Sequence, residues 1–201
     1  MSVLEAIGNT PLVEIVKINP YRDKVRVLAK LEGANPCGSV KDRPAAKMIE
    51  ETSALARDGA YEEIVFCGYG EPTCRLADVL EAARALKKLG LPLRLDTNGQ
   101  GNMINRRDVV PELSGVFDGV SVSLNAHDRS AYVRLCRPDA GEKAFDAVMD
   151  FIRRAAASRM ECTVTVLDHP DVNVEACRTL VASIPRARFR VRRYYITLDE
   201  E

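Results

Sequence analysis

Residues 64–73 read Ile-Val-Phe-Cys-Gly-Tyr-Gly-Glu-Pro-Thr, a short apolar run followed by a turn rich in glycine. The run is typical of a buried strand, and the glycines and the proline end it. Residues 76–89 then place apolar side chains at helical spacing, and Gly90 ends the expected helix. A second strand is expected at residues 93–95. This order predicts two parallel strands joined by a right-handed helical crossover.

The same alternation continues towards the C-terminus, with about five strand–helix units after Glu62. The remaining expected elements are strands at 120–124, 162–167 and 189–194, helices at 142–157 and 174–184, and a short helical or turn segment at 109–113. Strands that alternate with helices indicate a parallel sheet. The sequence therefore predicts an α/β fold, either a partial (β/α) barrel or an open sheet.

The first fifty residues have a different pattern. Strands are expected at residues 12–16 and 25–31, and the second alternates apolar and basic side chains as a half-buried strand does. A helix is expected from about Val40 to residue 56, with Ser39 as its N-cap. The N-terminal region is therefore expected to be a short β-β-α appendage.

The composition is that of an ordinary globular protein, with 46% hydrophobic and 29% charged residues. Lys+Arg and Asp+Glu both number 29, so the formal net charge is zero. This balance gives no reason to expect nucleic acid or a membrane as a partner, and small molecules are the expected ligands. The first residues lack the features of a signal peptide, so a cytoplasmic location is expected. The oligomeric state is left open.

The cysteines have none of the spacings that are typical of a metal site. They are Cys37, Cys67, Cys74, Cys136, Cys162 and Cys177. We expect no metal, and we expect each thiol to be reduced and buried. His127 and His169 lie beside Asp128 and Asp168, an arrangement that fits either a metal or acid–base pair or two surface histidines; the surface interpretation is favoured.

Alternating arginines give the last expected strand a basic face. They are Arg186, Arg188, Arg190, Arg192 and Arg193. Their alternation with Phe189 and Val191 predicts an amphipathic strand with one solvated face, whose charge also protects a sheet edge from aggregation. A phosphate-binding role is the less favoured alternative.

Two segments resemble the start of cysteine synthase, a fold-type-II pyridoxal-phosphate (PLP) enzyme. Residues 7–13 read Ile-Gly-Asn-Thr-Pro-Leu-Val, and residues 30–49 contain Asn-Pro-Cys-Gly-Ser-Val-Lys-Asp-Arg. The resemblance covers residues 1–52 and implies PLP as cofactor, with Lys41 as the catalytic Schiff-base lysine. The chain departs from the family after Thr52-Ser53, where Ala54-Leu55 replaces the expected Gly-Asn. The phosphate-holding loop is also absent, so the PLP site is incomplete.

The rest of the chain, from about residue 55 to 195, resembles a radical S-adenosylmethionine (SAM) protein of the group linked to TatD-type nucleases. The residues that carry the resemblance lie in segments 65–73, 95–102, 108–113, 120–126 and 132–138. It implies SAM-binding residues at the ends of strands, namely Gly70, Glu71, Pro72, Thr97, Asn98, Ser123 and Asn125. In this assignment Gly70 and Glu71 contact the SAM amino group, and Ser123 and Asn125 lie near the ribose. The competing interpretation makes Glu71 a turn carboxylate and Asn98-Gly99 a tight turn.

The second resemblance is also incomplete. The family holds a [4Fe–4S] cluster with a CxxxCxxC loop, and this sequence has none. Cys67 and Cys74 are seven residues apart and have no third cysteine nearby. The expected division is therefore a cysteine-synthase-like fragment at 1–52 and a partial barrel of radical SAM type at 53–201.

Three functional interpretations follow from these incomplete sites. In the first, the chain is a radical SAM core without its cluster, inactive or at most SAM-binding. In the second, it is a truncated PLP-dependent cysteine synthase of the O-acetylserine sulfhydrylase type. In the third, it is an artificial or recombined chimera with no evolved activity.

Overall fold

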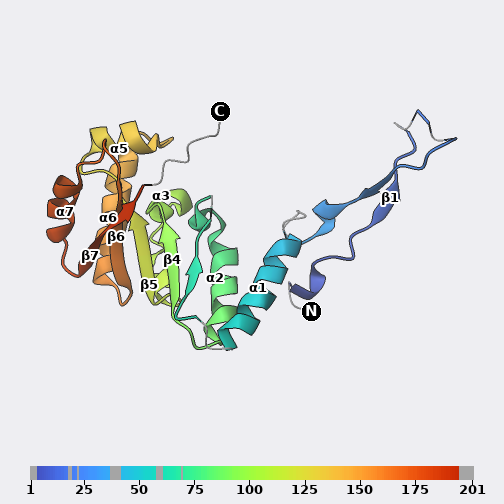
Figure 1. The fold of residues 1–201 in the computed structure, drawn as a ribbon, viewed down its shortest axis with the longest axis horizontal. Helices are drawn as coiled ribbons and strands as arrows, with labels where there is room; N and C mark the ends of the chain where they lie inside the picture. The colour runs from blue at the N-terminus through green and yellow to red at the C-terminus, as the bar shows by residue number, and fades with distance from the viewer. Residues whose placement is uncertain are drawn as a thin grey trace. The chain divides into compact units, whose positions relative to one another are not determined.

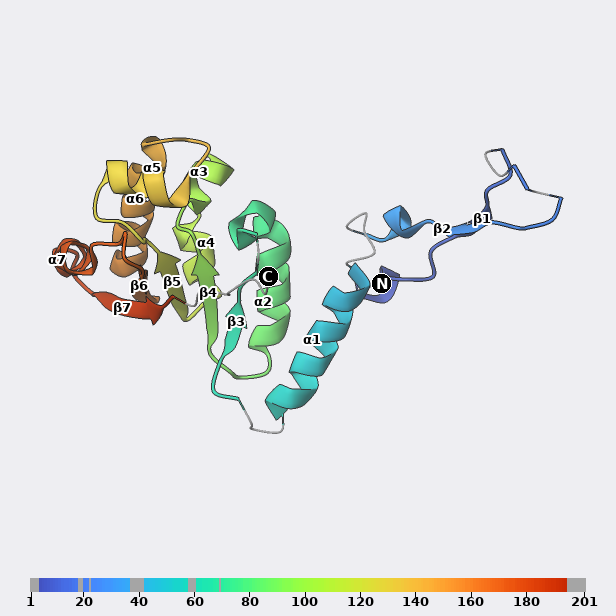
Figure 2. The same ribbon diagram turned by 45° about the horizontal axis from the view of Figure 1, so that its top comes forward.

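The computed structural model describes residues 4–17, 20–21, 23–36, 42–57, 61–68 and 70–194 (Figures 1 and 2). The chain forms two compact units, residues 1–60 and 61–201. Within the described residues, no helix combines the length and the apolar character needed to cross a membrane.

The larger unit is built on a five-stranded parallel sheet whose strands follow the order of the chain (Figure 1). The strands are β3 (Ile64–Phe66), β4 (Leu93–Thr97), β5 (Gly119–Ser123), β6 (Glu161–Asp168) and β7 (Ala187–Arg193). Each strand pairs in parallel with the next, as the sequence predicts, and such an order is that of consecutive right-handed crossovers. The predicted α/β fold with a parallel sheet is confirmed.

The helical segments of this unit lie between the strands. They are η3 (Pro72–Arg75), α2 (Leu76–Lys87), α3 (Gly101–Asn105), α4 (Val110–Ser114), α5 (Arg129–Cys136), α6 (Lys143–Ala157) and α7 (Val174–Ala182). Helices α3 and α5 were not predicted, because short helices carry too few apolar positions to show a helical period. The start of α5 is set by Asp128, whose side chain accepts a hydrogen bond from the backbone N–H of Ala131 at 2.8 Å.

The two faces of the sheet differ in polarity, because side chains alternate along each strand. On β4, Leu93 and Leu95 are fully buried, whereas Arg94 and Asp96 are half-buried. The apolar face packs against helices, and α6 contributes the fully buried Phe151. The opposite face, here called the polar face, carries Arg94, Asp96, Ser121, Ser123, Thr163, Thr165, Arg188, Arg190 and Arg192.

The smaller unit contains a two-stranded antiparallel sheet and one long helix. Its elements are η1 (Leu4–Ala6), β1 (Leu12–Glu14), β2 (Leu28–Lys30), η2 (Glu32–Ala34) and α1 (Asp42–Arg57). Leu12 lies opposite Lys30, and both strands are shorter than predicted. The expected helix start at Val40 and the N-cap Ser39 lie outside the described residues.

Polar contacts around one carboxylate connect the parts of the smaller unit. Glu32 accepts hydrogen bonds from Thr10 Oγ1 at 3.0 Å, Asn35 Nδ2 at 2.7 Å and Arg43 Nε at 2.8 Å. Asn35 Oδ1 in turn accepts from the N–H of Gly8 at 2.9 Å. The hydrogen bond from Arg43 is the main reason that the pKa of Glu32 falls to about 2. These five residues, the Glu32 cluster, join the two segments that resemble cysteine synthase.

Candidate functional site

A cavity of about 580 Å³ lies at the carboxyl ends of the strands in the larger unit. It is lined by Cys67, Gly68, Gly70, Glu71, Pro72, Asp96, Thr97, Asn98, Ser123 and Arg192. These residues come from β3, β4, β5 and β7 or from the turns that follow them. Parallel α/β folds commonly bind ligands at this edge, and the volume is in the range of small-molecule sites.

Most of the residues predicted to bind SAM meet at this cavity. Gly70, Glu71, Pro72, Thr97, Asn98 and Ser123 all line it. Asn125 is not among the lining residues; its Oδ1 accepts a hydrogen bond from the N–H of Leu167 at 3.1 Å and so connects the ends of β5 and β6. The parallel sheet therefore gathers six of the seven predicted positions around one space.

Glu71 connects two of the segments that line the cavity. Its Oε1 accepts hydrogen bonds from Thr73 Oγ1 at 2.6 Å, Thr73 N at 3.1 Å and Thr97 Oγ1 at 2.7 Å, and its Oε2 accepts from the N–H of Asn98 at 2.7 Å. All of these donors are neutral, and no described cation pairs with the carboxylate. Glu71 thus joins the turn after β3 to the end of β4 and leaves a negative charge at the cavity.

The turn after β4 is organised by its own side chains. Thr97 Oγ1 accepts from Gly99 N at 3.1 Å, and Asn98 Oδ1 accepts from Gln100 N at 2.9 Å. Gly99 has φ +79°, and a Cβ added there would lie 2.8 Å from Cγ1 of Val122. The turn therefore requires glycine. Among the described residues, nothing bonds to the side-chain N–H groups of Asn98 or to the hydroxyl of Ser123, so both remain available to a ligand.

Gly68 and Gly70 leave their backbone uncovered by side chains at the cavity. A Cβ added at Gly68 or at Gly70 would meet no heavy atom within 4 Å. Both residues line the cavity, so the space beside each backbone is open. A ligand can therefore approach peptide groups that a side chain would otherwise cover.

The sequence analysis missed two charged residues of the cavity, Asp96 and Arg192. Asp96 pairs with Arg94, which also pairs with Glu63 at 2.9 Å. The alternation along β4 and β7 places both residues on the polar face, and that signal is present in the sequence. The order of the strands was also needed to place them at one cavity.

The described cysteines do not fit an iron–sulfur cluster. No group of three or more His, Cys, Asp or Glu side chains among the described residues could hold a metal ion. Cys67, Cys74 and Cys136 are exposed, so the expectation that every thiol is buried is wrong for them. Cys162 and Cys177 are buried, and burial raises the pKa of each thiol to about 11. Cys37 lies outside the described residues.

The PLP site implied by the N-terminal resemblance centres on Lys41 and the loop at residues 52–55. Lys41 lies outside the described residues. Residues 52–55, where the substrate-binding loop of the PLP family is expected, lie within α1. A continuous helix does not present the run of backbone N–H groups that such a loop supplies, because those groups bond within the helix. The part of the site that the structure describes therefore does not fit the group.

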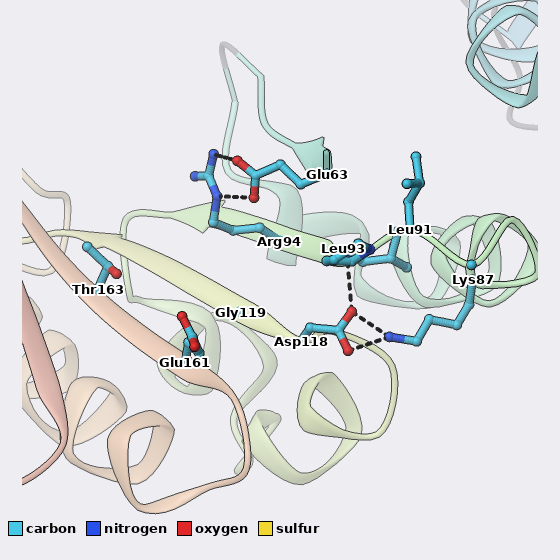
Figure 3. A pocket seen from close by; sticks show the side chains of 11 residues that line it. Glu63, Lys87, Leu91, Leu93, Arg94, Asp118, Gly119, Glu161 and Thr163 are labelled. Atoms are coloured by element: carbon cyan, nitrogen blue, oxygen red, sulfur yellow. Dashed lines mark hydrogen bonds and ion pairs between the residues drawn. The ribbon is translucent and has the colours of Figure 1, made fainter. Parts of the chain in front are cut away.

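A second cavity, of about 620 Å³, lies at the amino ends of the strands (Figure 3). Arg94 contacts Glu63 through two hydrogen bonds of 3.1 and 2.9 Å, which lower the pKa of Glu63. Lys87 pairs with Asp118 at 2.5 Å, and Asp118 also accepts from Leu93 N at 2.8 Å. The charged side chains of this cavity therefore neutralise one another in pairs, Arg94 with Glu63 and Lys87 with Asp118. This is expected at the amino ends of the strands, which contribute to stability rather than to ligand binding.

Sequence comparison relates the N-terminal part of the chain to PLP enzymes. The family model of pyridoxal-phosphate dependent enzymes matches residues 3–85. Cysteine synthase B of Escherichia coli is 33% identical over 137 residues, which cover 59% of this chain and 45% of that protein. N-(2-amino-2-carboxyethyl)-L-glutamate synthase of Cupriavidus metallidurans is 40% identical over 76 residues, 38% of this chain and 22% of that protein. The chain thus spans less than half of these curated relatives.

Structural comparison relates the chain to radical SAM folds. A domain of pyruvate-formate lyase-activating enzyme from Bacteroides vulgatus superposes with a TM-score of 0.54 at 18% identity, covering 69% of this chain and 84% of that domain. A radical SAM methyltransferase from Sphaerobacter thermophilus superposes with a TM-score of 0.50 at 18% identity, covering 73% of this chain and 46% of that protein. At this identity the likeness concerns the fold alone.

Proposed function

We propose that residues 61–194 bind S-adenosylmethionine in the cavity at the carboxyl ends of the strands. The observation that carries the proposal is the convergence of six residues, predicted from separate motifs, on one cavity of suitable volume. The likeness of the fold to a radical SAM methyltransferase supports the choice of ligand. Because the described cysteines do not fit a cluster, the proposal is confined to binding and includes no cleavage of SAM.

The lining residues offer groups that match different parts of SAM. Peptide carbonyls beside Gly68 and Gly70 can accept hydrogen bonds from the ammonium group, which the charge of Glu71 also favours. The hydroxyl of Ser123 and the side-chain amide of Asn98 can bond to the ribose hydroxyls. Glu71 in addition positions the Thr97–Gly99 turn through the hydrogen bonds it accepts from Thr97 Oγ1 and Asn98 N.

Isothermal titration of SAM into the full chain tests the proposal. Gly70→Val should lower the affinity by about tenfold or more, because the side chain enters space that the ligand needs. Its thermal unfolding should match that of the parent, since the new Cβ meets nothing within 4 Å.

Gly119→Ala is the matched control, because it adds a methyl group at the opposite cavity, where the nearest atom lies 3.5 Å away. It should leave the affinity unchanged. Absence of binding to the parent chain, or equal affinity of the Gly70→Val variant, would contradict the proposal.

A second candidate function is PLP binding at Lys41, favoured by the family match over residues 3–85. PLP followed by borohydride reduction should then modify Lys41 more than other lysines. Lys47 is the internal comparison, because it lies on α1, is exposed and pairs only loosely with Glu50 and Glu51 at 3.8 Å. Equal labelling of Lys41 and Lys47 would remove this candidate.

The interpretation as a chimera without evolved activity predicts that both experiments are blank. In that case SAM produces no heat and the lysines label alike. Sequencing reads that cross codons 45–60 would then test whether the two segments are joined in the natural gene.

A further inference from the structure

The carboxyl-end cavity carries opposite charges on its two sides. Glu71 and Asp96 supply carboxylates near the ends of β3 and β4. Among the lining residues, Arg192 on β7 is the cation. A ligand that satisfies both sides has a positive and a negative group of its own.

Two of the four arginines on the polar face, Arg190 and Arg192, form no ion pair with a described residue, whereas Arg94 and Arg188 do. Arg94 is shared between Glu63 and Asp96, and Arg188 pairs with Glu161 at 2.8 Å. The side chain of Arg192 makes no hydrogen bond or ion pair with any residue that the structure describes. Its guanidinium therefore retains its full set of donors, which are arranged to bind a carboxylate through two parallel hydrogen bonds.

The register of β7 explains why Arg192 reaches the cavity. Arg190 lies opposite Thr165 and Arg192 lies opposite Leu167, close to the carboxyl end of β6. Side chains two residues apart on a strand share a face and are about 6.6 Å apart along it. Arg190 and Arg192 thus have the same charge on the same face, but only Arg192 lines the cavity within the described residues.

We propose that Arg192 binds the carboxylate of an amino-acid ligand in this cavity and so selects zwitterionic over purely cationic ligands. The inference rests on the proposed function and specifies how SAM is oriented: its carboxylate lies at Arg192, and its positive groups lie towards Glu71 and Asp96.

The experiment compares SAM with decarboxylated SAM, which lacks the carboxylate and keeps the sulfonium, the amine and the nucleoside. The parent chain should bind SAM about 10- to 100-fold more tightly, the range expected for hydrogen bonds to a charged group. Arg192→Ala should weaken SAM binding by a similar factor and leave decarboxylated SAM unchanged, so that the preference disappears. Arg190→Ala should behave as the parent, because that residue does not line the cavity.

Each other outcome overturns the inference in an identifiable way. If the parent binds both ligands equally, or if Arg192→Ala keeps the preference, Arg192 does not bind the carboxylate and the proposed function still stands. If Arg190→Ala has the same effect as Arg192→Ala, the effect is one of general charge. If inorganic phosphate binds through Arg192 while SAM shows no preference, the site binds phosphate. If the parent binds no SAM, the proposed function fails and this inference fails with it.

Discussion

The two units of the chain differ in what stabilises them. In the larger unit, Leu95 and Phe151 have no exposed surface, and an apolar core lies between the sheet and its helices. In the smaller unit no described apolar side chain is buried, and Leu12 is 60% exposed. The buried residues that the structure describes in this unit are polar, Thr10 and Asn35, and both belong to the Glu32 cluster. One unit is held by hydrophobic burial and the other by hydrogen bonds and an ion pair.

Sequence likeness and core formation are therefore separate properties in this chain. The smaller unit includes segments that are about half identical to cysteine synthases over some 50 residues, yet none of the apolar side chains whose burial the structure describes there is buried. The larger unit shares only 18% of its residues with the solved structures it resembles, yet its sheet is complete from β3 to β7. An isolated two-stranded sheet is marginal in water, so β1 and β2 depend on further contacts such as those of the Glu32 cluster.

The largest expected effect tests the contrast directly. Phe151→Ala should lower the free energy of unfolding of the larger unit by about 3–5 kcal/mol, because it leaves a cavity in the core. Leu12→Ala should change stability by less than about 0.5 kcal/mol, because the side chain is already in contact with water. Urea denaturation followed by circular dichroism measures both. A large loss for Leu12→Ala would show that the smaller unit buries this residue in solution.

Gly90 and Gly99 separate the cost of backbone strain from the cost of overpacking in the larger unit. Gly90 and Gly99 both have φ +79°, but only Gly99 has a neighbour, Val122, within 2.8 Å of an added Cβ. Gly90→Ala should cost about 1 kcal/mol from backbone strain alone. Gly99→Ala should cost about 2–4 kcal/mol, because overpacking is added to the strain. Equal losses in thermal unfolding would mean that the Gly99 turn moves to relieve the contact.

The smallest effect concerns the pH dependence of the smaller unit. The pKa of Glu32 is lowered from 4.5 to about 2, so an unfolded chain takes up this proton at a higher pH than the folded chain does. The stabilisation is complete above pH 4.5 and is lost as the pH falls towards 2. The protection of the Gly8 amide against hydrogen exchange, taken relative to the intrinsic rate at each pH, should fall as the pH is lowered across this range in the parent.

Glu32→Gln should remove most of this dependence on pH, since the amide does not titrate. Glu14→Gln is the matched control, because Glu14 belongs to an exposed pair with Arg26 at 3.1 Å in the same unit, and such pairs contribute little. A parent chain whose Gly8 exchange shows no change between pH 4.5 and 2 beyond the intrinsic rate would argue against the Glu32 cluster as the main support.

Local patterns predicted the order of the elements but not all of them. The apolar runs near Ile64, Leu93 and Val120 are the strands β3, β4 and β5. Helix α5 was missed because its start depends on one hydrogen bond, which the Asp128 side chain accepts from the N–H of Ala131, rather than on periodicity. The expectation of a half-buried strand at residues 25–31 was wrong for Val27 and Leu31, which are 40% and 45% exposed. Alternation identifies the two faces of a strand, but burial also requires a partner for the apolar one.

The residues of the carboxyl-end cavity could also be predicted from the sequence only in part. Parallel strands present their carboxyl ends at one edge, so the positions from Gly70 to Ser123 could be grouped from the sequence. The missing CxxxCxxC loop could likewise be read directly from the residues. The hydrogen bonds that Glu71 accepts from Thr97 and Asn98, 26 and 27 residues away, could not be read from the residues. Nor could the position of Arg192 at the same cavity, because it comes from a strand more than a hundred residues further along the chain. Short-range sterics and side-chain period set the strands and helices, whereas contacts across the sheet depend on strand order, register and packing.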